Sequence, residues 1–194
     1  MTLDIRNANP AHTALLVMDH QRLLVEGYMP DPDRHLKAVA AVVAKSRAGG
    51  LSVIYVRKAF RPGYPEVHDA NIVFSAVRAG GRLLESDEMT EIPAAIAPTQ
   101  DDIVVRGCRI SAFEGTELAL ILRARKIDTL VMFGIATSGV VLSTVRQGAD
   151  MDYRMFVVRD LCGDNDAAVH DFLMDRILPR QAAVISSSEL LDAV

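Results

Sequence analysis

The stretch Ala14-Leu15-Leu16-Val17-Met18-Asp19 decides the fold of this 194-residue chain. An unbroken apolar run of strand length predicts a strand covered on both faces, as in a parallel sheet with helices on each side. Asp19 follows directly, so the sequence predicts a carboxylate at the edge of an apolar sheet.

Strand-like apolar runs recur along the chain and alternate with segments of helical periodicity. Further strands are predicted at 53–56, 103–105, 129–133, 155–158 and 183–185. Helices are predicted between the loop 27–32 and Gly49, at about 116–126, 140–151 and 167–177, and at the carboxyl terminus. The alternation predicts one α/β domain over residues 1–194, built on a mainly parallel six-stranded sheet.

Residues 57–100 interrupt this alternation. The segment contains Pro62-Gly63, Gly80-Gly81, Pro93 and Pro98, and it is too long for a plain connection in a compact domain. We expect an excursion that covers a site or forms an interface.

Charge and composition narrow the range of partners. The formal net charge is −4, and no run of Lys or Arg is long enough to follow a phosphate backbone, so nucleic acid is not an expected partner. No apolar stretch is long enough to span a membrane, and residues 1–10 lack the regions of a signal peptide, so we expect a cytoplasmic protein. Cys108 and Cys162 are then expected to be free thiols.

The carboxyl ends of the predicted strands should meet at one edge of the sheet, where open parallel sheets bind ligands. The residues expected at this edge are Asp19, Arg57, Lys58, Arg106, Gly134 and Asp160. Desolvation at such an edge raises the pKa of a carboxyl, which favours a general acid or base role for Asp19. The alternative is that Asp19 only caps the following turn.

Two other groups of residues allow both a functional and a structural interpretation. The small residues of 134–140 could present backbone N–H groups to an anion, or form a tight turn with Ser138 as N-cap. Arg57, Lys58, Arg106 and Arg109 could receive a substrate carboxylate, or be solvated.

Histidine spacing does not indicate a metal site. The five histidines are His12, His20, His35, His68 and His170, and no two share a helix face with a carboxylate. A phosphate-cradling glycine motif does not follow the first strand, which weighs against a flavodoxin-like nucleotide-binding domain. No metal and no cofactor are expected.

Three motifs occur in the order and spacing of a known superfamily. They are Leu15-Leu16-Val17-Met18-Asp19-His20-Gln21, Ser111-Ala112-Phe113 and Gly134-Ile135-Ala136-Thr137. With the flanking segments 115–118 and 157–160, the chain resembles the isochorismatase-like hydrolases over about residues 14–188. The resemblance implies a three-layer α/β/α sandwich of Rossmann-like type, usually oligomeric, that hydrolyses small amides, ureas or a vinyl ether.

The resemblance also assigns catalytic positions, two of which hold unsuitable residues. Cysteine-dependent members use an Asp, a Lys and a Cys, which map to Asp19, Gly107 and Val140. The family's non-proline cis peptide maps to Ile135-Ala136, and its oxyanion contacts map to the N–H groups of Ala136 and Val140. Because valine cannot attack a carbonyl, hydrolysis through a thioester is not expected.

The remaining residues favour a mechanism without a thiol. As the resemblance implies, isochorismatase itself uses an Asp to protonate a vinyl-ether carbon, after which water adds to the cation. Asp19 is the expected acid or base, and the sequence leaves open whether Arg106, Arg109 or Lys58 supplies the missing lysine charge. Substrate contacts are expected from Gln21, Lys58, Arg106, Arg109, Phe113, Ile135, Ala136 and Thr137.

The leading hypothesis is therefore a hydrolase that acts on a small anionic metabolite. The alternative is a catalytically silent relative that binds a small ligand or serves as an assembly subunit. The absence of the Lys and Cys supports that alternative.

Overall fold

The computed structural model describes residues 3–194 and contains one six-stranded, wholly parallel sheet. The strands are β1 (Thr13–Met18), β2 (Ser52–Lys58), β3 (Ile103–Gly107), β4 (Thr129–Gly134), β5 (Arg154–Val158) and β6 (Ala183–Ile185). Their order is β3-β2-β1-β4-β5-β6. The six strands predicted from the sequence are confirmed, and the strand order is that of a Rossmann-type fold.

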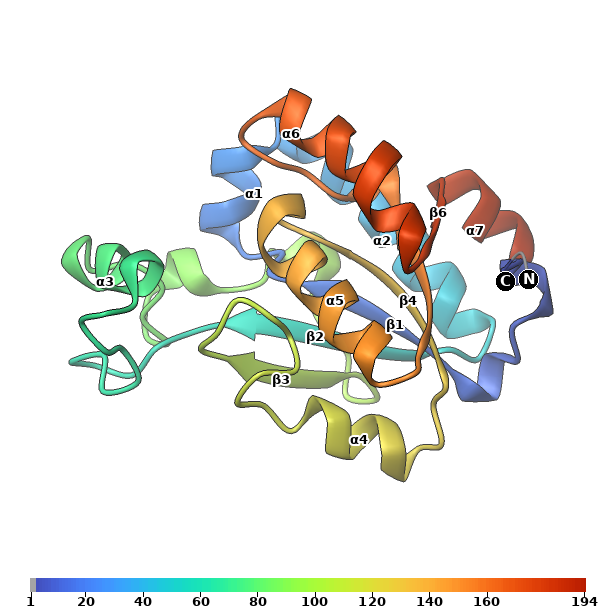
Figure 1. Cartoon of the computed structure of the whole chain (residues 1–194), viewed down its shortest axis with the longest axis horizontal. Helices are drawn as coiled ribbons and strands as arrows, with labels where there is room; N and C mark the ends of the chain where they lie inside the picture. The colour runs from blue at the N-terminus through green and yellow to red at the C-terminus, as the bar shows by residue number, and fades with distance from the viewer. Residues whose placement is uncertain (1–2) are drawn as a thin grey trace.

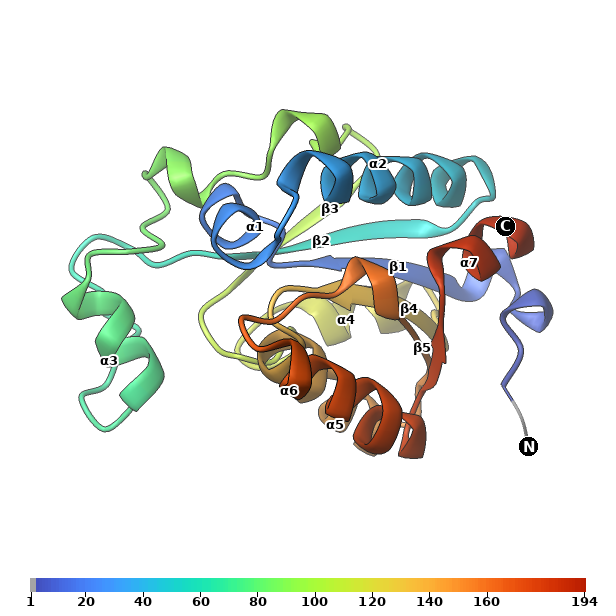
Figure 2. The same cartoon turned by 90° about the horizontal axis from the view of Figure 1, so that it is seen from above.

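Helices cover both faces of the sheet, which gives three layers (Figure 1). The helices are α1 (Arg22–Tyr28), α2 (Pro32–Ala48), α3 (Ile72–Ala79), α4 (Leu118–Ala124), α5 (Leu142–Asp150), α6 (Ala167–Phe172) and α7 (Ser187–Ala193). Figure 2 shows α1 and α2 on one side of the sheet and α4, α5 and α6 on the other. Burial on both faces explains why β1 and β4 are fully buried and contain no polar residue after their first threonine.

The strand order changes direction between β1 and β4. The chain runs outward from β1 to β2 and β3 on one side, and from β4 to β5 and β6 on the other. Ligands of such sheets bind beside the carboxyl ends of the strands at this switch point. Asp19 follows β1 there, and Gly134 ends β4 opposite Met18.

Two helices were not predicted from the sequence. Helix α1 begins at Arg22, with Gln21 as its N-cap, and ends at Tyr28, inside the predicted loop 27–32. Helix α3 lies in the excursion 57–100, and its amino end is capped by Asn71. The predicted helix at 140–151 begins instead with a π-helical turn, Thr137–Val141, before α5.

The excursion has a small apolar core of its own. Its buried members are Phe60, Tyr64, Val67, Phe74 and Leu83, separate from the main core around the sheet. Figures 1 and 2 show α3 beyond the end of the sheet, away from the other helices. In residues 3–194, no helix is long and apolar enough to cross a membrane.

Candidate active site

Asp19 and Lys58 form a buried ion pair at the carboxyl edge of the sheet. Asp19 follows β1, and Lys58 is the last residue of the neighbouring β2. Lys58 Nζ lies 3.0 Å from Asp19 Oδ2, with the two side chains 7% and 4% exposed respectively. Among the three cations considered, Lys58 is thus the one that contacts Asp19.

The backbone after β3 orients the Lys58 ammonium group. Besides Asp19, Nζ donates to the carbonyl oxygens of Arg109 at 2.5 Å and Ile110 at 3.4 Å. An ammonium group has three protons, so each has an acceptor. The loop that follows the family's lysine position therefore holds a lysine from the adjacent strand.

Gln21 fixes the end of β2 relative to β1 and the excursion. Its Nε2 donates to the carbonyl oxygens of Lys58 and Thr90, each at 2.8 Å, and its Oε1 accepts from Lys58 N at 2.8 Å. The side chain is fully buried. Its amide is occupied by backbone groups, so the geometry places Gln21 as a support of Lys58.

Burial raises the pKa of Asp19, and the charge of Lys58 and its hydrogen bond lower it only in part. Among the described residues, Asp19 Oδ1 has no hydrogen-bond partner. Loss of water disfavours the charged form of a carboxyl. A carboxyl that keeps its proton at higher pH is suited to donate that proton to a substrate.

The segment after β4 places Val140 beside the end of β1. The peptide Ile135-Ala136 is cis, as the resemblance implied. A Cβ on Gly134 would lie 2.9 Å from Val140 Cγ1 and 3.0 Å from the Met18 carbonyl oxygen. Val140 therefore packs against Gly134 next to Met18, and its side chain is buried.

The backbone N–H groups of this segment are largely used within the protein. Thr137 N donates to the Gly163 carbonyl oxygen at 2.7 Å, and Ser138 N donates to Asp164 Oδ2 at 2.7 Å. The residue before the π-helical turn is Ala136, without a side-chain cap, so Ser138 is not the N-cap. The oxyanion contacts expected from Ala136 and Val140 stay a prediction.

Gly107 lies next to Lys58 in the sheet. The two residues are paired in the register of β2 and β3, and Ala59 N donates to the Gly107 carbonyl oxygen. A Cβ on Gly107 would meet only Thr116 and Val56, both at 3.8 Å. Gly107, to which the resemblance assigns a lysine, therefore lies beside Lys58 and has ordinary contacts for a side chain.

The three arginines near the strand ends bind groups of the excursion and its neighbours. Arg57 donates to the Thr90 carbonyl oxygen and pairs with Glu91. Arg106 pairs with Glu66 at 3.1 Å. Arg109 donates to the carbonyl oxygens of Cys108 and Glu66. The structure does not bring these guanidinium groups to Asp19.

The Ser111-Ala112-Phe113 motif attaches the loop after β3 to α5. Ser111 Oγ donates to Gln147 Oε1 at 2.7 Å, and Ala112 N donates to Thr144 Oγ1 at 3.0 Å. The Phe113 ring is buried and stacks on Tyr153, which lies before β5 at the opposite edge of the sheet. Phe113, which was expected to contact the substrate, thus packs in the core against Tyr153, whereas Ile110, directly before the motif, bonds to Lys58.

Both thiols are protonated and bonded to backbone oxygens. Burial raises the pKa of Cys162 to about 12, and its Sγ donates to the Val158 carbonyl oxygen. Burial also raises the pKa of Cys108, whose Sγ donates to the Ala59 carbonyl oxygen. Because the thiolate is the nucleophile, neither cysteine is activated for attack.

His20, the residue after Asp19, forms a buried pair with His35 that was not predicted from the sequence. His20 Nδ1 lies 3.1 Å from the Met18 carbonyl oxygen, and the Nε2 atoms of His20 and His35 are 3.0 Å apart. Burial lowers the pKa of His20 to about 3 and that of His35 to about 4. The burial of His35 could have been predicted, because the residue lies at helical spacing from Val39, Val42 and Val43 on the buried face of α2.

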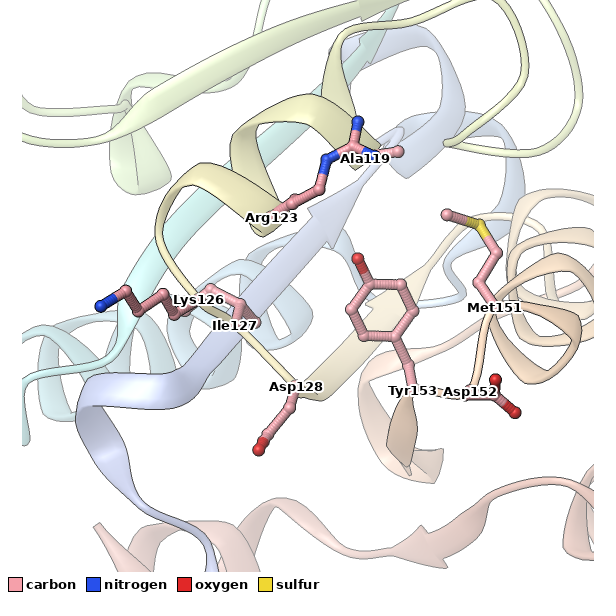
Figure 3. Close-up of a pocket in the computed structure, with 8 residues that line it drawn as sticks. All are labelled: Ala119, Arg123, Lys126, Ile127, Asp128, Met151, Asp152 and Tyr153. Carbon is pink, nitrogen blue, oxygen red and sulfur yellow. The ribbon is translucent and has the colours of Figure 1, made fainter.

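Pockets occur at both edges of the sheet. One of about 630 Å³ lies at the carboxyl edge, between α2 and the segment after β5, and His35 and Asp160 line it. Another, of about 440 Å³, lies at the amino edge (Figure 3) and is lined by Arg123 and Tyr153. The amino-edge pocket is therefore remote from Asp19 and Lys58.

Known proteins match the chain over nearly its whole length. Residues 13–189 match the isochorismatase domain. The uncharacterized isochorismatase family protein YecD of Escherichia coli O157:H7 is 32% identical over 192 residues, which are 96% of this chain and 98% of YecD. Ureidoacrylate amidohydrolase RutB of Stutzerimonas stutzeri is 32% identical over 171 residues, 77% of this chain and 69% of RutB.

Solved structures share the fold. A cysteine hydrolase from Pseudomonas syringae pv. phaseolicola superimposes with a TM-score of 0.86 at 24% identity, covering 96% of this chain and 93% of its own. N-carbamoylsarcosine amidase from Thermoplasma acidophilum has a TM-score of 0.73 at 29% identity, covering 90% and 96%. With a family match that spans the sheet and its edge residues, this chain belongs to the isochorismatase family.

Proposed function

We propose that this protein hydrolyses a small anionic metabolite without a thiol, with Asp19 as the proton-transferring group. The observation that carries the proposal is the buried Asp19–Lys58 pair at the switch point of the sheet. Asp19 is held at a strand end by its N–H, which donates to the Val56 carbonyl oxygen at 2.8 Å. Lys58 positions Oδ2, and its positive charge attracts an anionic substrate to the site without a direct hydrogen bond.

The proposed reaction is the hydrolysis of a vinyl ether or a related bond. Asp19 donates its proton to the vinyl carbon, and the carbon that bears oxygen becomes an oxocarbenium ion. Water adds to this ion and returns a proton to the Asp19 carboxylate. In the resulting hemiketal, the bond between this carbon and the original ether oxygen then breaks, which gives a carbonyl product and an alcohol.

Relatives support the substrate class. Ureidoacrylate amidohydrolase and maleamate amidohydrolase are named for small amides that also carry a carboxylate. The substrate panel should therefore contain carboxylates that bear a vinyl ether, an amide or a ureido group. The absence of an activated thiol favours the vinyl ethers over the amides.

The test is Asp19→Asn, assayed on this panel. Asn keeps the size of the side chain but cannot exchange a proton at neutral pH. We expect kcat to fall by roughly 10² to 10⁴, the usual contribution of general acid–base catalysis. Circular dichroism must show that the variant is folded.

Replacement of Cys108 and Cys162 by alanine is the matched control and should leave kcat within a few-fold of wild type. An active, folded Asp19→Asn protein contradicts the proposal. A wild-type protein that is inert on the whole panel but stabilised by a small carboxylate would instead favour a silent, ligand-binding relative.

A further inference from the structure

The pocket between α2 and the segment after β5 differs from the Asp19–Lys58 site in position and lining. Its volume of about 630 Å³ lies within the range of roughly 300 to 1,000 Å³ that is typical of small-molecule sites. Neither Asp19 nor Lys58 lines it. Its polar wall includes His35, Asp160 and Asp164, and its apolar wall includes Tyr28 and Met29.

The hydrogen bonds of two histidines fix what His35 presents to this pocket. A carbonyl oxygen only accepts, so His20 Nδ1 carries the proton that is donated to the Met18 oxygen. In a neutral ring, His20 Nε2 is then a bare acceptor, and His35 Nε2 must donate to it. His35 is neutral as well, so its Nδ1 carries a lone pair and no proton.

His35 Nδ1 is an acceptor that opens onto the pocket. The residue is 9% exposed and lines the pocket, and no described residue hydrogen-bonds to Nδ1. Nδ1 is not one of the buried atoms without a partner, so solvent in the pocket reaches it. A ligand that donates a hydrogen bond can take the place of that solvent.

The charged side chains that line the pocket favour a ligand with positive charge. Three carboxylates line it, from Asp31, Asp160 and Asp164, against one cationic side chain, Arg34. Asp160 lies close enough to His35 to raise its pKa against the larger, lowering effect of burial. Both oxygens of Asp160 already accept from Ser187, and each keeps acceptor capacity.

We propose that this pocket binds a small organic cation with an apolar body, whose N–H group donates to His35 Nδ1 and whose charge is paired with Asp160. An aromatic amidine or an arylalkyl ammonium ion has the required shape. Its ring lies against Tyr28 and Met29, and its cationic head faces the imidazole and the carboxylate. The site is separate from the proposed catalytic pair.

The direct test compares benzamidine with its neutral and anionic analogues, benzamide and benzoate. Benzamidine should bind saturably and raise the Tm by roughly 5 to 10 °C at a concentration 100 times its Kd. NMR of methyl-labelled protein should show the Met29 methyl signal shifting during the titration. Equal or stronger binding of benzoate overturns the proposal, as does the absence of saturable binding by both benzamidine and phenethylammonium.

Variants locate the site. His35→Phe keeps a flat ring but removes the acceptor, and it should weaken benzamidine binding at least ten-fold. Because His35 is buried, Ala167→Trp provides a second variant that fills the pocket from the exposed start of α6, with Ala168→Trp as its matched control outside the pocket. Lys58→Met should bind benzamidine as wild type does. Loss of binding in Lys58→Met, or unchanged binding in Ala167→Trp, contradicts the assignment.

Discussion

At the scale of single residues, Lys58 lies next to Gly107, the position to which the family resemblance assigns a lysine. The two residues are partners in the β2–β3 ladder, and partners in a parallel ladder project to the same side of the sheet. Side chains at the two positions therefore lie side by side. We expect a lysine at 107 to supply the ammonium group that Lys58 brings to Asp19 Oδ2.

This relation predicts a rescue. Lys58→Met removes the cation beside a buried carboxyl, so the pKa of Asp19 should rise further. Because Oδ2 also loses the group that positions it, kcat should fall at least ten-fold. Adding Gly107→Lys to Lys58→Met should restore part of that kcat, because a side chain at 107 meets only ordinary contacts. The measurement is the pH profile of kcat for the single and double variants.

Lys126→Met, on the exposed surface, is the control for loss of a lysine. A double variant no better than Lys58→Met would show that the ammonium must come from β2.

The excursion is the element whose stability is most separate from the sheet. It contains α3, and its small core packs against Leu23, Cys108 and Ile110 of the rest of the chain. Local units with few contacts to the main core open at lower free energy than the sheet. Changes in this core should therefore act first on residues 60–85.

Phe74→Ala should loosen the excursion while leaving the sheet closed. Phe74 is buried against Phe60, with ring centroids 5.3 Å apart, and a Phe→Ala change in a core lowers stability by about 3 to 5 kcal/mol. Hydrogen exchange should become faster for the amides of α3 and of residues 60–85, but not for those of β1. Ile72→Ala, at a side chain 86% exposed on the same helix, is the control and should change exchange little. Equal acceleration in β1 would show that the excursion unfolds only with the whole domain.

At the scale of the whole molecule, buried titratable groups make stability depend on pH. His20 and His35 have lowered pKa values in the folded protein, so the unfolded chain binds more protons between about pH 4 and 6.5. Their stabilising contribution is therefore present above pH 6.5 and is lost as pH falls toward the folded values. Asp19 has a raised pKa and acts in the opposite sense, since its contribution is lost as pH rises above 3.8.

His35→Leu isolates one part of this dependence. A histidine such as His35 contributes roughly 1 kcal/mol per pH unit to the slope of the unfolding free energy between pH 4.5 and 6. Urea denaturation across this range should show that His35→Leu has a slope smaller by about that amount. Val39→Ala, buried on the same helix, should lower stability without changing the slope. An unchanged slope in His35→Leu would mean that His35 is protonated in the folded protein.

The sequence by itself determined the six strands, the carboxylate at the end of β1 and the family. Apolar runs such as 14–18 and 129–133 are local patterns, and burial on both faces of a sheet leaves few other structures for them. The motif residues around Asp19 and Ile135-Ala136 are likewise local. The helix α1 and the helix α3 were missed, because short helices that are held by tertiary contacts have weak local signals.

Only the tertiary structure decided which side chains meet. Lys58 contacts Asp19 because β2 pairs with β1 in one register, and this register places the end of β2 beside the turn after β1. His35 meets His20 because α2 packs over the sheet with its buried face toward β1. Neither pairing has a signature in the spacing of the residues, since contacts between distant segments depend on strand order and helix packing, which periodicity does not encode.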